Sequence, residues 1–300
     1  MVGHVDEAAL LAALRRLPLH PGARDLRDDA AVVGPFVLTT DTLVEGVHFL
    51  PDDPSGDVAW KLVAVNLSDL AAKGAMPEGV LLNYPLTDDA WDRAFVAGLD
   101  RALGSLDCVL IGGDTVSLPP GAPRVLTLTA IGRDAAAPSR CGAQAGDALW
   151  VTGTIGDAGA GLRIARGKPG PAALLDRYRR PSPRLAEGRA LAPLVHAMSD
   201  VSDGLLIDAA RMAAASGLAV TVDLAAVPLS PELRRFDADP RTAATAGDDY
   251  ELLFALPAGT APPVAAACIG RFEAGDGLTL HDRGRPVPLP DRLGFEHGTR

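Results

Sequence analysis

Aspartates are the residues whose types and positions could do chemistry together in this sequence. Most of the candidates fall where a strand is expected to end or a helix to begin, the positions at which open α/β sheets bind ligands. The set is Asp28, Asp29, Asp41, Asp69, Asp114, Asp200 and Asp203. Thr39 and Thr40 add two hydroxyls directly before Asp41. Mg²⁺ prefers such hard oxygen ligands and combines them with substrate phosphates, so the set predicts several Mg²⁺ ions and a polyphosphate ligand.

Each aspartate also has a purely structural interpretation. An aspartate before a helix is most often its N-cap, which would account for Asp203. Tight turns would account for three others: Asp28, Asp29 and Asp114. Asp69 lies in an apolar helical segment on the same face as Lys73, so its carboxylate needs donors or a cation. A salt bridge to Lys73 or to an arginine is the alternative to a metal there.

The sequence contains no pattern for a zinc site or a covalent nucleophile. None of the six histidines lies at metal-ligand spacing, and the three cysteines form no CxxC pair. Because no Ser/His/Asp or Cys/His arrangement is present either, we expect neither a general base nor a covalent nucleophile. His48, shortly after Asp41, is either a ligand contact or an ordinary loop histidine.

A glycine-rich segment at residues 153–161, GTIGDAGAG, follows an expected strand. Its glycine spacing nearly matches the P-loop, but Leu162 and Arg163 stand where lysine and serine or threonine are required. The chain has no GxGxxG motif, so a dinucleotide site lacks support. The segment is therefore either an anion site at a helix N-terminus or a plain tight turn.

Composition is that of a soluble globular protein with two domains. Of the 300 residues, 48% are apolar and 22% are charged. The net charge of −10 repels nucleic acid and anionic lipid, so neither is expected as a main partner. The N-terminus carries acids where a signal peptide carries bases, and no uncharged apolar run reaches the ~18 residues of a membrane span. With scattered cysteines that fit a reducing compartment, we expect a cytoplasmic protein without membrane association.

Alternating strands and helices must position these residues. The first half predicts strands at residues 36–40, 79–84, 108–111 and 125–131, and helices at 57–74 and 88–103, each helix opening with an aspartate cap. A second alternating set covers residues 148–152, 158–166, 183–197, 203–216, 219–222 and 250–256, and 257–267 is expected to be a surface connection. The pattern predicts an α/β (α+β) fold with two α/β domains, at residues 1–140 and 141–300.

Eight segments in order along the chain resemble one family. They are DDAAVV (28–33), TTDTLVEGVHF (39–49), AVNLSDLAAKGAMP (64–77), IGGDT (111–115), SRCGAQAGDALWVTGTIGDAGAGL (139–162), RPSPR (180–184), SDVSDGL (199–205) and GDDYELLF (247–254). Together they resemble thiamine-monophosphate kinase, of the aminoimidazole-ribonucleotide-synthetase-like ATP-binding superfamily. The resemblance covers nearly the whole chain.

The resemblance implies a fold, an activity and an assembly. It implies an N-terminal ATP-binding domain with a mixed sheet flanked by helices, which forms a homodimer through that sheet, and a C-terminal α/β domain that completes the active site. The implied reaction is direct, in-line, Mg²⁺-assisted transfer of a phosphoryl group from ATP, the co-substrate, to thiamine monophosphate.

The resemblance also implies roles for individual residues. The implied Mg²⁺ ligands are Asp29, Thr39, Thr40, Asp41, Asp69, Asp114, Asp200 and Asp203. The implied ATP contacts are Gly113, Asp114, Arg140 and Ser202. The implied thiamine-phosphate contacts are His48, Asp248 and Phe295, for which a turn-capping aspartate and a surface aromatic are the structural alternatives at the last two positions.

Two other functions remain open at this point. One is another ATP-dependent enzyme of the same superfamily with a different acceptor pocket. The other is a non-catalytic protein that binds a magnesium–nucleotide complex. Formation of thiamine diphosphate from ATP and thiamine monophosphate would separate these three possibilities.

Overall fold

The strands expected at residues 36–40 and 125–131 form, and both are longer than the sequence predicts. The computed structural model describes residues 7–133 and 136–296. In it, β2 (Phe36–Val44) and β5 (Val125–Arg133) pair in antiparallel register along their whole length. Alternate residues of β5, such as Leu126 and Leu128, are buried, which is typical of a strand with one face on a core.

These two strands form the middle of the first sheet. Within the described residues this sheet has five strands in the order β1-β2-β5-β3-β4, completed by β1 (Ala31–Val33), β3 (Met76–Leu86) and β4 (Leu110–Ser117). The β3–β4 pair is parallel and the others are antiparallel. The mixed sheet expected for the N-terminal half is therefore present.

The second sheet is built from the C-terminal half of the chain. Among the described residues it has seven strands in the order β12-β11-β8-β10-β6-β9-β7. Their bounds are β6 (Ala148–Thr152), β7 (Ala197–Asp200), β8 (Ala219–Asp223), β9 (Leu252–Leu256), β10 (Ala266–Glu273), β11 (Gly277–Asp282) and β12 (Arg285–Val287).

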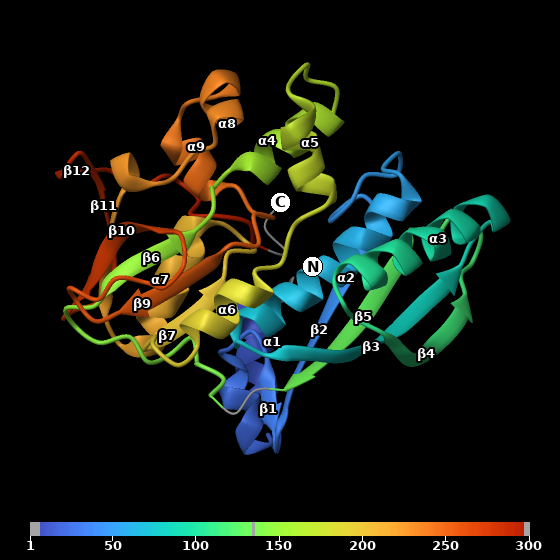
Figure 1. Ribbon diagram of the computed structural model, residues 1–300, viewed down its shortest axis with the longest axis horizontal. Helices are drawn as coiled ribbons and strands as arrows, with labels where there is room; N and C mark the ends of the chain where they lie inside the picture. The colour runs from blue at the N-terminus through green and yellow to red at the C-terminus, as the bar shows by residue number, and fades with distance from the viewer. Residues whose placement is uncertain (1–6, 134–135, 297–300) are drawn as a thin grey trace, which may run out of the picture.

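Helices cover the two sheets and fill the space between them (Figure 1). They are α1 (Glu7–Leu14), η1 (Pro21–Leu26), α2 (Ser55–Ala72), α3 (Asp89–Ser105), α4 (Asp157–Ala165), α5 (Ala172–Arg179), α6 (Leu185–Leu191), α7 (Leu205–Ser216), η2 (Leu224–Ala226), α8 (Pro231–Phe236) and α9 (Pro240–Thr245). No helix in the described part of the chain is long and apolar enough to cross a membrane.

Helix α2 lies at the centre of the molecule, with the second sheet on one side and the first sheet on the other (Figure 1). Its Leu62 and Leu67 pack in the core of the first sheet. Its last turn, with Ala71 and Ala72, packs against Phe254 of β9 in a separate core. Because α2 is buried on nearly all sides, its polar side chains must find partners inside the protein.

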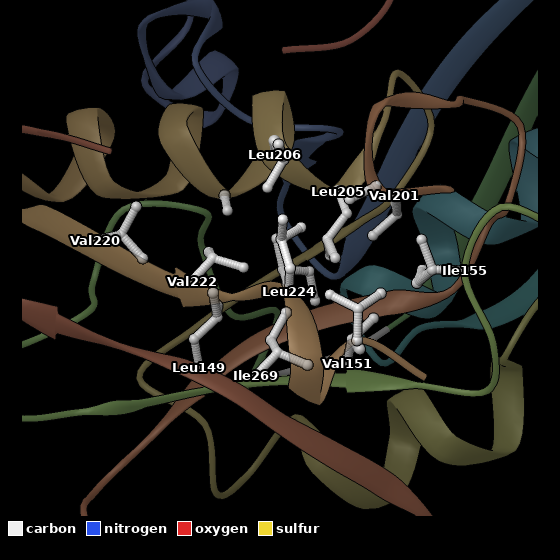
Figure 2. Packing of buried hydrophobic residues seen from close by; sticks show 14 of the residues in the cluster. Leu149, Val151, Ile155, Val201, Leu205, Leu206, Val220, Val222, Leu224 and Ile269 are labelled. Carbon is white, nitrogen blue, oxygen red and sulfur yellow. The ribbon is translucent and has the colours of Figure 1, made fainter. Parts of the chain in front are cut away.

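The core of the second sheet packs its β-branched residues against α7 (Figure 2). Val151, Val220 and Ile269 come from three strands, and Leu205 and Leu206 come from the helix. All five side chains are almost completely buried. This core holds the start of α7, and with it the preceding loop, at a fixed distance from the end of β7.

Several element boundaries differ from the sequence prediction. Strands β2 and β4 continue through Asp41 and Asp114, so these aspartates lie within strands and not at their ends. The stretch 183–197 contains the short helix α6, and strand β7 follows directly at Ala197. Residues expected in a surface connection include Ala266, where β10 begins.

The two expected helix caps have different outcomes. Asp88 caps α3, because its carboxylate accepts a hydrogen bond from the Trp91 amide at 2.9 Å. Asp57 is not a cap: α2 begins two residues earlier, and Asp57 in its first turn pairs with Arg180. The Asp57 carboxylate instead forms an ion pair with the residue directly after α5 (Ala172–Arg179).

Candidate active site

Three carboxylates from distant parts of the chain meet at the junction of the two sheets. Asp29 precedes β1, Asp69 lies in α2 and Asp200 ends β7. One oxygen of each lies within 4.8 Å of the others. The arrangement therefore offers a divalent cation ligands from both halves of the chain.

Asp41 extends this cluster along β2. Strand alternation puts Thr39 and Asp41 on the same face, where the Thr39 hydroxyl donates to the Asp69 carboxylate and, at 3.2 Å, to the carbonyl of Asp29. Burial, together with the charges of Asp29 and Asp203, raises the pKa of Asp41 to about 6. We call Asp29, Asp41, Asp69, Asp200 and Asp203 the carboxylate cluster.

The carboxylate cluster carries more negative charge than its surroundings compensate. Burial raises the pKa of Asp69 well above its ordinary value, and repulsion by Asp41 and Asp200 adds to the effect. Burial and the charge of Asp29 likewise raise the pKa of Asp200, against an opposing hydrogen bond from the Ser68 hydroxyl. A bound divalent cation would relieve this repulsion, so the donor set fits Mg²⁺.

Asp28 stands beside the cluster but is already neutralised. Its oxygens accept bonds from Lys73, Arg24 and Ser139. Although burial opposes it, the charges of Lys73 and Arg24 lower the pKa of Asp28 to about 2. Asp28 therefore serves as a buried ion-pair partner and is more than a turn residue.

Lys73 does not form the salt bridge to Asp69 that the sequence suggested as an alternative to a metal. Its ammonium is fully buried and contacts Asp28, Asp29 at 2.8 Å and the carbonyl of Met198 at 3.1 Å. The Asp69 carboxylate instead accepts from Thr39. The sequence placed both residues on one helical face, but Lys73 follows the last residue of α2, and its ammonium lies beside the residues before β1.

Arg140 brings a second fixed positive charge to the cluster. Its guanidinium pairs with Asp29, and its backbone amide donates to Asp28 at 3.3 Å. The Arg140 Nε is buried and finds no hydrogen-bond partner within residues 7–133 and 136–296. A buried guanidinium with a spare donor beside a cation site suits an anionic ligand such as a phosphate.

The loop before α7 is held by a residue that sequence analysis missed. The Asp208 carboxylate accepts bonds from the amides of residues 202, 203 and 204 at 3.1–3.2 Å. Asp203 is therefore not the cap of α7, and its side chain pairs with Arg211, which also contacts Asp208. The sequence did contain a signal for this role: Asp208 and Arg211 are an acid and a base three residues apart in the first turns of a helix, a spacing that favours an ion pair.

The acceptor-side candidates lie close to this loop. Asp248 pairs with Lys61 at 2.8 Å and accepts from the Tyr250 hydroxyl at 3.0 Å. The Phe295 amide donates to the carbonyl of Asp203, and the Phe295 ring is 46% exposed. The His48 Nδ1 accepts from the Val44 amide at 3.0 Å. Asp248 therefore has protein partners on both carboxylate oxygens.

Three other residues predicted from the sequence, Gly113, Asp114 and Thr40, do not join the carboxylate cluster within a single chain. Asp41 on β2 pairs with Leu128 on β5, Leu128 pairs with Leu82 on β3, and Leu82 pairs with Gly113 on β4. Gly113 is therefore three strand spacings from Asp41, roughly 14 Å. Asp114, the next residue on exposed β4, is displaced similarly. The Thr40 hydroxyl bonds the Leu128 carbonyl and the Thr129 hydroxyl, and strand alternation places it on the face of β2 opposite to Thr39 and Asp41.

The glycine-rich segment at residues 153–161 forms the turn into α4. Asp249 lies at this helix N-terminus, where its buried carboxylate accepts from the amides of Gly156 at 2.8 Å and Ala158 at 3.4 Å. Burial raises the pKa of Asp249 despite these bonds. The protein's own carboxylate thus fills the position considered for an external anion.

The fold and this site define a protein of the AIR synthase related class. The model for "AIR synthase related protein, N-terminal domain" matches residues 27–133, and the model for its C-terminal domain matches residues 144–281. The match covers the first sheet, the second sheet up to β11, and every member of the carboxylate cluster.

Comparison with individual relatives narrows the class. The thiamine-monophosphate kinase of Caulobacter vibrioides is 40% identical, over 93% of this chain and 86% of the relative. The Escherichia coli K12 enzyme of the same name is 39% identical, over 87% and 86%. The solved structure of AaThiL complexed with AMPPCP and TMP matches with a TM-score of 0.86 and 30% identity, covering 98% of this chain and 97% of the other. The chain belongs to the thiamine-monophosphate kinase family.

Proposed function

We propose that this chain transfers the γ-phosphoryl group of ATP to thiamine monophosphate and forms thiamine diphosphate. The observation that carries the proposal is the carboxylate cluster beside the buried guanidinium of Arg140. Two phosphates repel each other as they approach, and a reaction between them needs positive charge held in place. The names of the relatives and the ligands of the AaThiL complex support the same reaction.

Several Mg²⁺ ions would be held by the carboxylate cluster, with Thr39 as a further oxygen ligand. Bound there, Mg²⁺ would neutralise charge on the transferring phosphoryl group. Arg140 would bind a phosphate oxygen through its spare Nε donor, and Ser202 would contact ATP from the loop that Asp208 holds. These roles place ATP at the junction of the two sheets.

The acceptor requires no general base in this proposal. A phosphate monoester has a second pKa near ~6, so thiamine monophosphate is already an anionic nucleophile at neutral pH. Direct in-line attack then needs positioning by His48, Asp248 and Phe295 and no covalent phosphoenzyme. A carboxylate and an aromatic ring suit the cationic thiazolium and the flat pyrimidine of thiamine.

A homodimer built through the first sheet would complete the site. Edge strand β4 is exposed along its whole length, and Leu110, Ile111 and Val116 are each about half exposed. A second copy would cover these apolar side chains. It would also bring its own Gly113 and Asp114 towards a cluster that they do not reach within one chain.

The proposal also includes a domain boundary and a cellular compartment. We place the domains at residues 1–140 and 141–300, since the first sheet ends at Arg133 and the second begins at Ala148. Arg140, on the connection, would couple the two. Use of ATP and three unpaired cysteines support a cytoplasmic, reducing compartment.

One assay tests the function. The protein is incubated with ATP, Mg²⁺ and thiamine monophosphate, and thiamine diphosphate is measured by chromatography, with EDTA as the control. Product that depends on all three reactants supports the proposal. If ATP is consumed only when a different acceptor is supplied, the protein is another enzyme of the class. If the nucleotide binds but is not turned over, the protein is a binding protein.

A further inference from the structure

Lys61 is a buried lysine that the phosphate chemistry does not use. It lies in α2 and is 2% exposed. Within the described chain its ammonium makes three contacts: it donates to the His48 carbonyl at 3.0 Å and to Asp248 Oδ2 at 2.8 Å, and it lies 4.3 Å from the centre of the Tyr178 ring. A lysine ammonium has three donors and no acceptor; two donors serve His48 and Asp248, and the Tyr178 ring adds a cation–π attraction.

The three contacts join segments that are far apart in the sequence. His48 follows β2 of the first sheet, Asp248 precedes β9 of the second, and Tyr178 lies in α5. His48 and Asp248 are also the two polar residues proposed to bind the acceptor. One ammonium therefore fixes the spacing between both sides of the acceptor site.

The turn that carries Asp248 needs such a restraint. Asp248 and Tyr250 have φ values of 70° and 52°, a region that residues other than glycine rarely adopt. The backbone amide of Asp248 donates a hydrogen bond to the Ser202 carbonyl at 2.7 Å, and that of Tyr250 donates to the Val201 carbonyl at 2.8 Å. These bonds hold the turn on the loop before α7. The ion pair between Lys61 and Asp248 connects the turn to α2.

We infer that Lys61 is a positioning residue for the acceptor: it sets the affinity for thiamine monophosphate through His48 and Asp248 without touching the substrate. The inference rests on the proposed function. Loss of the ammonium would release the Asp248 side chain, already 29% exposed, while the contacts of Arg140 and the carboxylate cluster stay as they are. The expected defect is therefore confined to one of the two substrates.

Lys61→Met tests this, because methionine keeps an unbranched apolar chain against Tyr178. We expect the KM for thiamine monophosphate to rise at least tenfold, with the KM for ATP within twofold and kcat within a few-fold of wild type. Arg179→Met is the matched control: it removes a 2.9 Å ion pair to Asp53 near the same α2–α5 contact. This control should lower the melting temperature without a selective change in either KM.

A double variant distinguishes positioning from general loosening. If Lys61 acts through Asp248, Lys61→Met combined with Asp248→Asn should raise the KM for thiamine monophosphate no further than the larger single effect. Additive effects, or equal KM increases for ATP and thiamine monophosphate, would overturn the inference and leave the proposed function standing. Wild-type protein that forms no thiamine diphosphate would overturn both.

Discussion

Positive charge from the protein meets the carboxylate cluster at two members: Arg211 pairs with Asp203, and Asp29 has two cationic partners. Lys73 and Arg140 both pair with it, whereas Asp41 and Asp69 face mainly other carboxylates. The residues with uncompensated charge are those on which bound cations would depend most. Substitutions there should affect turnover more than folding.

Asp41→Asn should lower kcat at least 100-fold at saturating Mg²⁺ while the fold stays intact. The amide keeps the shape but removes a charge that would hold Mg²⁺ against the phosphates, and a 100-fold loss corresponds to about 2.7 kcal/mol. Turnover and the circular dichroism spectrum are measured together. Thr42→Val, whose hydroxyl bonds Thr127 on the other face, should keep near-normal activity; equal loss in both variants would remove Asp41 from the metal site.

The stability of the metal-free protein should fall as pH rises from about 5 to 7. Burial and neighbouring acids raise the folded-state pKa of Asp41 and of Asp208 to about 6. The folded state therefore binds protons that the unfolded state has released, and the stabilisation is lost as pH passes through 6. For buried Asp208 the loss between pH 5 and 7 is about 1.4 kcal/mol, which corresponds to one pKa unit.

Melting temperatures in EDTA across this pH range measure the effect. Mg²⁺ should flatten the part due to Asp41, and Asp208→Asn should remove the part due to Asp208. A melting temperature that rises steadily from pH 5 to 7 without metal would contradict this prediction.

At the scale of elements, α2 does the most to build the site. It presents Asp69 to the cluster and Lys61 to the acceptor side, and Lys73, directly after its last residue, pairs with Asp28 and Asp29. These side chains reach three different sets of partners, which is possible because α2 is buried on nearly all sides. The close approach of α6 is part of that burial.

Gly188→Ala in α6 should destabilise the protein by about 1–3 kcal/mol, because a Cβ there would lie 2.0 Å from the carbonyl oxygen of Ala71 in α2. The melting temperature should fall by several degrees. Gly104→Ala in α3 is the control, since an added Cβ meets nothing within 4 Å, and alanine favours a helix. Similar losses in both variants would show that the α2–α6 contact can relax.

For the whole molecule, the proposed dimer would make the exposed β4 a link between assembly and activity. Ile111 and Asp114 lie on the same strand, so one interface would bury the first and place the second near the partner's cluster. Dimer formation and turnover should therefore be lost together.

Ile111→Glu should convert the dimer to a monomer, as measured by light scattering, and lower turnover at least tenfold. A buried glutamate at the interface would carry an unpaired charge. Val96→Glu on α3, where Val96 is 59% exposed, should keep both the dimer and the activity. A monomeric wild type with full activity would contradict the proposed assembly.

The sequence by itself predicted many of the strands and helices in their correct order, and it singled out the aspartates as oxygen ligands for Mg²⁺. Hydrophobic alternation is local, so residues 125–131 are recognisable as a strand without a partner, and Asp88 is recognisable as a cap. The family resemblance likewise identified Asp29, Asp69 and Asp200, which the structure brings together.

Tertiary structure alone decided which residues serve one another. Lys73 reaches Asp28 and not Asp69, Asp208 and not Asp203 holds the loop before α7, and Asp249 fills the helix N-terminus at residue 156. Each choice pairs groups far apart in the chain or on different sides of a turn. Ion pairs and hydrogen bonds depend on distances of about 3 Å, and only the packing of the two sheets around α2 sets distances that precisely.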